Sequence, residues 1–175
     1  LKYTPVPVVG APSGLAAGGG YEVLTHCDKL VVHTNSVMGL VEAAVGVVPG
    51  GGGVKDTYFR WHAEKGNWDE AAWQTWMNIG YAATGSSPQL SARMQYFRTD
   101  YDETVMNRDR LLPRAIALVT SLQDGYRVPE KPMATLASPN LYEKMDSFMR
   151  EGVERGDFMP HDRTVAMQIA GIVLR

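Results

Sequence analysis

The sequence predicts an α/β fold that continues into a mainly helical region. Up to about residue 55, short runs of β-branched residues alternate with glycine-rich turns, and beyond it Trp, Met, Ala and Leu recur at helical spacing. With 175 residues, of which 45% are hydrophobic, the chain is long enough to bury one sizeable core. We therefore expect one domain, with a core part at 1–55 and a helical part at 56–175.

The first part should consist of short strands joined by a crossover helix. The runs VPVVGA (6–11) and KLVVHT (29–34) are short and apolar, as buried strands are. The stretch between these runs is long enough for a helix that returns the chain to the same sheet, and we place that helix at about 19–27.

The remainder should be helical, with two extended interruptions. Residues 51–65 and 69–82 form a helical pair, and Trp73 and Trp76 lie three residues apart on one face, which favours core positions for both rings. Further helices are predicted at 87–97, from near Leu112, at 138–156 and at 160–175, with extended pieces around 104–106 and at 125–133.

The composition argues against several classes of function. The formal net charge of −2 provides no basic surface for nucleic acid. Cys27 is the single cysteine, which excludes an intramolecular disulfide and favours a reducing, cytoplasmic compartment. His26 and Cys27 are neighbours that point apart on a helix, so we expect no metal site. The sequence shows neither a signal-peptide pattern nor an apolar run of membrane length, so we expect a soluble protein.

Three glycines lead into a carboxylate in GLAAGGGYE (14–22). Glycine lets the backbone approach a ligand closely, so a glycine run that enters a helix is typical of main-chain amides facing an anion. The run lacks the Gly-Lys-Ser/Thr of a P-loop and the GxGxxG of a dinucleotide site. An oxyanion hole that includes the amide of Gly19 remains, with Glu22 about one turn into the helix.

A second carboxylate, Glu42, follows in MGLVEAAVGVVPGGGG (38–53). The chain passes through a predicted strand before reaching it, so Glu42 can return to the sheet edge that carries Glu22, and two converging carboxylates suit general acid–base catalysis. Ordinary interpretations exist as well. Glu22 alone could complement a helix dipole, and glycines 50–53 could form a flexible turn.

The stretches APSGLAAGGGYEVLTHCDKLVV and VMGLVEAAVGVVPGGGG resemble the enoyl-CoA hydratase (crotonase) superfamily over roughly residues 5–55. The resemblance implies a truncated crotonase-like fold of ββα type, followed by a helical C-terminal region. It also implies that Gly19 supplies an oxyanion-hole amide, that Glu22 and Glu42 are catalytic, and that Gly50 lies in the substrate-binding Pro-Gly pair.

Family members that keep both glutamates are typically hydratases, so the resemblance implies a lyase that adds water to trans-2-enoyl-CoA. Val41 departs from the pattern, because many hydratases have proline before the second glutamate. Double-bond isomerisation and thioester hydrolysis are alternative reactions within the same superfamily. A non-catalytic oligomerisation module is an alternative from a different class, since the helical remainder exceeds what the site needs.

The later stretches ETVMNRDRLLPRAIAL and GYRVPEKPM are similar to the hydratase portion of bifunctional 3-hydroxyacyl-CoA dehydrogenases of β-oxidation. Both chain ends look like cuts, so we expect a C-terminal portion of a hydratase domain that is inactive in isolation. The resemblance implies acyl-CoA as substrate, no cofactor in this chain, and NAD only in an upstream domain. It also implies a homo-oligomer, a trimer or a dimer of trimers.

Overall fold

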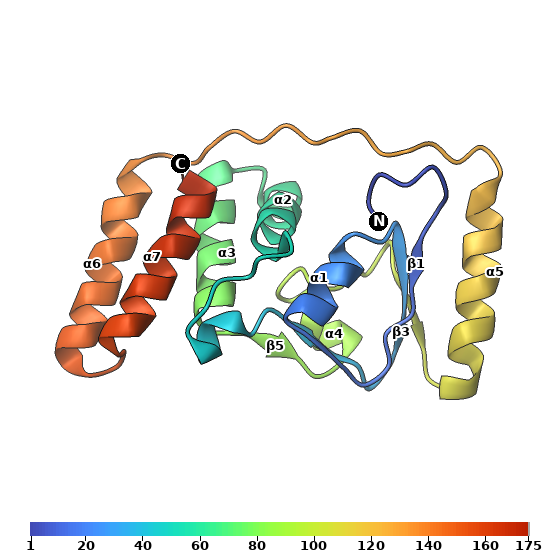
Figure 1. The fold of residues 1–175 in the computed structure, drawn as a ribbon, viewed down its shortest axis with the longest axis horizontal. Helices are drawn as coiled ribbons and strands as arrows, with labels where there is room; N and C mark the ends of the chain where they lie inside the picture. Colours follow the sequence, from blue (N-terminus) through green and yellow to red (C-terminus); the bar gives the residue numbers. More distant parts are fainter. Residues whose placement is uncertain (175) are drawn as a thin grey trace. The chain divides into compact units, whose positions relative to one another are not determined.

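The computed structural model describes residues 1–174, which form two compact units (Figure 1). Leu1–Gly39 and Thr84–Pro132 make up the first, here called the strand unit. Leu40–Ala83 and the residues from Met133 onward make up the second, the helical unit. The boundary between the units thus differs from the change in composition near residue 55, because the contacts place residues 40–55 with the helices.

The strand unit consists of short strands with three α-helices and one 3-10 turn among the described residues. Its elements are β1 (Val9–Gly10), β2 (Leu15–Ala17), α1 (Gly19–Thr25), β3 (Lys29–His33), β4 (Val37–Gly39), β5 (Thr84–Gly85), α4 (Pro88–Ala92), β6 (Glu103–Val105), η2 (Arg108–Arg110) and α5 (Leu111–Gln123).

These strands form two sheets, in the orders β1-β3-β6 and β2-β4-β5. All pairs are parallel except β4 with β5. Val9 pairs with Lys29 in one sheet and Leu15 pairs with Val37 in the other. Along the chain, β1 enters one sheet and β2 enters the other. After the crossover through α1, β3 pairs with β1 and β4 pairs with β2. This order confirms the mixed α/β fold class.

The first strand is shorter than predicted because prolines precede it. Pro5 and Pro7 have no N–H to donate to a sheet. The N–H of Val8 bonds the side chain of Asp28 at 2.7 Å instead of a strand partner. Regular pairing therefore begins only at Val9.

The core of the strand unit includes the contact between β3 and α5. Val31 of β3 packs with Leu111, Ala115 and Leu118, which share one face of α5. The helix begins at Leu111 and tolerates Pro113 because the first N–H groups of a helix have no intrahelical acceptor. The predicted start near Leu112 is confirmed within one residue.

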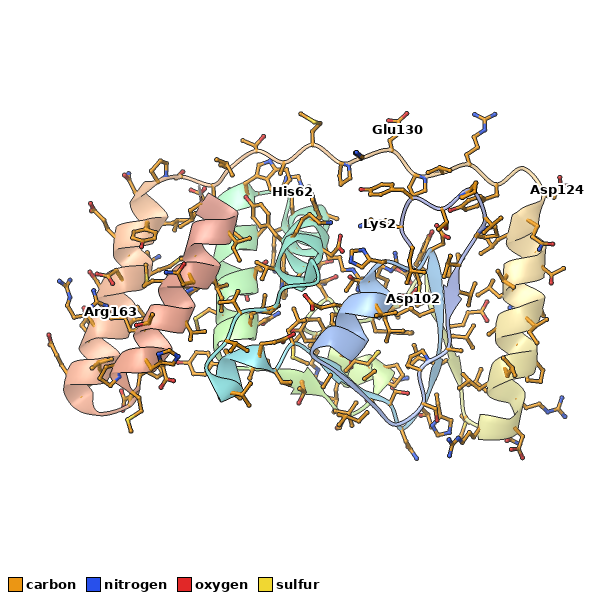
Figure 2. The ribbon with its side chains drawn as sticks, in the orientation of Figure 1. Lys2, His62, Asp102, Asp124, Glu130 and Arg163 are labelled. Carbon is orange, nitrogen blue, oxygen red and sulfur yellow. The ribbon has the colours of Figure 1, made fainter. Side chains whose placement is uncertain are left out.

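A buried carboxylate ties β3 to the turn before β6 (Figure 2). Asp102 accepts the N–H groups of Leu30 and Arg98, each at 3.0 Å. The guanidinium of Arg98 adds two bonds to the same carboxylate, at 2.7 and 2.9 Å. Because both oxygens of Asp102 have charged or main-chain donors, the negative charge is tolerated in the interior.

The helical unit contains η1 and four α-helices within residues 40–83 and 133–174. These are η1 (Glu42–Val45), α2 (Gly53–Lys65), α3 (Trp68–Gly80), α6 (Asn140–Arg155) and α7 (Pro160–Leu174). Helices α6, α7 and α3 lie side by side in Figure 1, where α7 contacts both of the others. The predicted helices 51–65, 69–82, 138–156 and 160–175 are confirmed within two residues, except that residue 175 lies outside the described part.

The two tryptophans of α3 differ in burial. Trp76 is 2% exposed and its indole N–H donates to the carbonyl of Ala166 at 2.9 Å, which confirms its core position. Trp73 is only partly buried, and the ammonium group of Lys144 lies over its ring, 4.6 Å from the ring centre. Met145 of α6 is fully buried.

One predicted helix, 87–97, is wrong in length. The helix α4 ends at Ala92, and Gln95 takes a left-handed φ of 60° that no α-helix contains. Tyr96 is then fully buried, with its N–H bonded to the carbonyl of Ser91 at 2.9 Å. The apolar residues of this stretch are therefore buried by a turn and do not form one face of a helix. Within residues 1–174, no helix has the length and apolar character needed to cross a membrane.

Candidate active site

The turn from β2 into α1 depends on Gly18. This residue is buried with φ 57° and ψ −129°, a conformation that a side chain would strain. Its N–H donates to the carbonyl of Gly39 at 2.8 Å, beside the Ala17–Gly39 pair of β2 and β4. The glycine that the turn requires is thus one residue before Gly19, the predicted oxyanion glycine.

Gly19, the predicted oxyanion glycine, is the first residue of α1 and is exposed. Apart from its chain neighbours and the backbone of its own helix, no described atom lies within 4 Å of the place that a Cβ on Gly19 would take. The surface at Gly19 is therefore open to a ligand, as an oxyanion amide requires.

Glu22 lies one turn into α1 and is 6% exposed. Its N–H bonds the carbonyl of Gly18 at 3.0 Å, and its own carbonyl accepts the hydroxyl of Thr25 at 2.8 Å. The neighbouring Tyr21 is fully buried and donates its hydroxyl to the carbonyl of Tyr96 at 3.3 Å. Glutamate is seldom buried for packing reasons alone, so a buried Glu22 favours a functional role.

Glu42 opens the 3-10 turn η1 in the helical unit. The preceding Val41 has φ −113°, far from the −65° that proline requires, which gives a physical reason for valine at this departure from the family pattern. The turn closes at Gly46, whose carbonyl accepts the Nε2–H of His161 at 2.9 Å. No local pattern in the sequence points to this contact, because the two residues lie so far apart along the chain.

Gly50 also lies in the helical unit, exposed and directly after the buried Pro49. Two residues later, Gly52 precedes α2 with a left-handed φ of 99°. The turn interpretation therefore holds for Gly52, and Gly50 stays a predicted substrate-binding residue.

The structure divides the predicted site residues between the two units. Gly19 and Glu22 share α1 in the strand unit, whereas Glu42 and Gly50 belong to the helical unit. No group of three His, Cys, Asp or Glu side chains suited to a metal ion occurs within residues 1–174. Cys27 is buried, and burial, with the nearby charge of Asp28, raises the pKa of its thiol, which makes it unreactive at neutral pH.

Comparison with known proteins agrees with these features. Residues 1–62 match the family model described as enoyl-CoA hydratase/isomerase. The chain is 32% identical over 175 residues to a probable 3-hydroxyacyl-CoA dehydrogenase of Bacillus subtilis, covering 99% of this chain and 22% of that protein. It is 31% identical over 151 residues to a putative fatty acid oxidation complex trifunctional enzyme of Rickettsia felis, covering 84% and 19%. The chain thus spans 22% and 19% of the lengths of these relatives.

Among solved structures, the fold is similar to that of enoyl-CoA hydratase subunit I from Geobacillus kaustophilus. The TM-score is 0.52 at 19% identity, and the match covers 95% of this chain and 53% of that one. The α/β arrangement is therefore that of the enoyl-CoA hydratase fold. The family model and the curated relatives support the crotonase superfamily for this chain, and residues 1–62 carry the match to the family model.

Proposed function

We propose that the protein carrying this sequence is an enoyl-CoA hydratase of fatty acid oxidation. The observation that carries the proposal is the place of the two glutamates after paired strands. Ala17 and Gly39 are partners at the carboxyl ends of the parallel strands β2 and β4. Glu22 lies in the first helix after β2, and Glu42 opens the turn after β4. Active sites of parallel sheets form at such strand ends.

The proposed reaction adds water across the C2–C3 double bond of a trans-2-enoyl thioester. The amide of Gly19 donates to the thioester carbonyl oxygen, where negative charge develops as water attacks C3. One such donor contributes about 2.7–4 kcal/mol to the transition state. Of Glu22 and Glu42, one accepts the proton that the water loses and the other delivers a proton to C2, on the same face.

The relatives' names support the metabolic setting, since they include a 3-hydroxyacyl-CoA dehydrogenase and a fatty acid oxidation enzyme. We propose acyl-CoA as substrate and no cofactor for these residues. Neither glycine run, 18–20 or 50–53, has the GxGxxG spacing of a nicotinamide site.

We also propose a homo-oligomer, in line with the family resemblance. Leu112 and Ile116 of α5 are 65% and 54% exposed, and exposed apolar side chains favour association. Light scattering of the purified protein at two concentrations tests this, and a monomer at both would contradict it.

Three substrates separate the proposed reaction from its alternatives. Crotonyl-CoA should lose the absorbance of its conjugated thioester as water adds. A trans-3-enoyl-CoA should gain that absorbance only if the protein is an isomerase, and butyryl-CoA should release free thiol only if it is a thioester hydrolase. Turnover of crotonyl-CoA that exceeds both other rates is expected, and the reverse order would overturn the hydratase proposal.

A further inference from the structure

The helical unit contains a cavity of about 340 Å³ that the proposed reaction leaves unused. Its walls come from η1, from the C-terminal end of α3 and from the hairpin of α6 and α7. The volume lies within the range of small-molecule sites in proteins.

The floor of this cavity is apolar. It is formed by Trp76, Met149, Val165 and Ala166, each at most 6% exposed. The one side-chain N–H among them, on Trp76, is already donated to the carbonyl of Ala166 at 2.9 Å. A floor without free polar groups gives water no partner, so it favours an apolar occupant.

The walls are held in place before any ligand binds. The rings of Trp76 and Phe148 meet edge to face at 5.6 Å, and Phe148 lies 6.0 Å from Phe158. A Cβ on Gly152 would overlap the ring of Phe158, so glycine is what lets this ring pack on α6. Arg163, labelled in Figure 2, ties α7 to α6 through two bonds to Asp146 at 2.8 and 3.0 Å.

The two carboxylates that line the cavity have other partners. Asp157 pairs with Arg155 at 2.8 Å. Asp162 accepts the N–H of Met159 at 2.8 Å, at the start of α7. Asp157 has a cationic partner and Asp162 keeps its negative charge beside a neutral donor, so neither carboxylate favours an anionic ligand, and the apolar floor suits an uncharged chain.

The cavity also borders the turn that carries Glu42. Ala43 and Ala44 line it, and both follow Glu42 directly in η1. We propose that the cavity binds the alkyl chain of the enoyl thioester whose double bond reacts at Glu42. This inference rests on the proposed hydratase function and adds the substrate class, a medium-chain acyl group.

A cavity of about 340 Å³ lies in the size range of small-molecule sites, so it has room for an alkyl chain of several carbon atoms. Each methylene group that leaves water for an apolar site improves binding by about fourfold. A ten-carbon acyl-CoA should therefore bind much more tightly than a four-carbon one.

Gly80 allows the cavity to be filled without strain. It lines the cavity at the end of α3, and no described atom lies within 4 Å of the place of its Cβ. Gly80→Phe should place a ring in the space meant for the alkyl chain. Gly171→Phe is the matched control, because Gly171 is also helical with open space at its Cβ and is not among the lining residues.

The experiment measures binding of saturated decanoyl-CoA and butyryl-CoA to the protein that carries this sequence, by calorimetry. The parent protein and Gly171→Phe should prefer decanoyl-CoA by more than about tenfold, and Gly80→Phe should lose about tenfold or more of that preference. Unchanged preference in a folded Gly80→Phe protein would overturn the inference. If Gly80→Phe does not fold, Ala44→Phe at the exposed rim makes the same test.

The two proposals can fail separately. Saturated thioesters do not undergo hydration, so their binding reports on the cavity alone. Loss of preference in Gly80→Phe without any crotonyl-CoA hydration by the parent would reject the hydratase function and retain an alkyl-chain site. Hydration with a preference that Gly80→Phe leaves unchanged would reject the cavity assignment alone.

Discussion

The Nε2–H of His161 donates to the carbonyl oxygen of Gly46 at 2.9 Å, although the two residues are 115 positions apart. Gly46 ends the turn that Glu42 begins, and His161 lies in the first turn of α7. The bond therefore fixes the backbone beside a proposed catalytic carboxylate to the helix pair that encloses the cavity.

His161→Ala should lower kcat for crotonyl-CoA by about 2- to 10-fold with a smaller change in KM, because one hydrogen bond contributes about 0.5–1.5 kcal/mol. His161→Gln should restore most of the loss, since its amide can also donate to the Gly46 carbonyl. Steady-state kinetics of the three proteins makes the comparison. Parental kcat in His161→Ala would show that the tether does not position the turn.

Gly18→Ala should destabilise the fold by about 1–3 kcal/mol, because alanine must adopt the strained backbone at φ 57° and ψ −129°. Gly20→Ala is the control, since Gly20 is exposed, helical and surrounded by open space. It should leave stability unchanged or raise it by about 0.4–1 kcal/mol. Urea unfolding compares the two, and equal midpoints would contradict the strain at Gly18.

Asp102→Asn should cost about 3–5 kcal/mol of stability, because it leaves the partly buried guanidinium of Arg98 without its charged partner. The pair of Arg114 and Glu103 offers a contrast at 2.6 Å, with side chains 49% and 31% exposed. Glu103→Gln should cost less than about 1 kcal/mol, since solvent screens an exposed pair. Thermal unfolding of both variants tests the difference, and an equal loss would contradict the role of burial.

The phenol of Tyr58 should lose its proton at a higher pH than an ordinary tyrosine. Burial, with the charge of Asp69, raises the pKa of its phenol to about 12 from 10.0. Its hydroxyl donates to the carbonyl of Thr135 at 3.0 Å, a bond that ionisation would remove. Because the folded pKa is the higher one, this contribution to stability is complete below pH 10.0 and is lost as the pH rises towards about 12.

The measurement is the ultraviolet titration of tyrosinate in the parent protein and in Tyr58→Phe. The difference between the two curves should show one ionisation centred near pH 12. A difference centred near pH 10.0 would place Tyr58 in solvent and contradict its burial.

Short sequence patterns predicted many of the helices and one of the strands. The β-branched run of β3 and the periodic apolar faces of α2, α3, α6 and α7 give elements within two residues of those predicted. The strands β2, β4 and β5 were missed, because segments of two or three residues carry no strand signature and these three are strands only through pairing with one another. Pairing of this kind depends on register between distant segments, which no short window contains.

The site shows the same limit. Glycines followed by a carboxylate are a local pattern, so Gly19, Glu22, Glu42 and Gly50 could be proposed from the sequence. The glycine with the demanding conformation is Gly18, because which member of a glycine run turns the chain depends on where the strand ends. The cavity draws on η1, α3, α6 and α7 together, and such a lining becomes visible only when the helices are packed.

The central claim is that Glu22 and Glu42 act as a pair on one water, and a double-mutant cycle in crotonyl-CoA hydration tests it most directly. Glu22→Gln and Glu42→Gln should each lower kcat by about 10²–10⁴ with the fold intact, because the amide keeps the shape and removes the proton transfer. The double variant should lose little more than the worse single variant, since residues that act as a unit are not additive. Glu64→Gln, exposed on α2, is the matched control and should keep parental turnover. Near-parental turnover in either single variant, or losses that simply multiply in the double variant, would contradict the account.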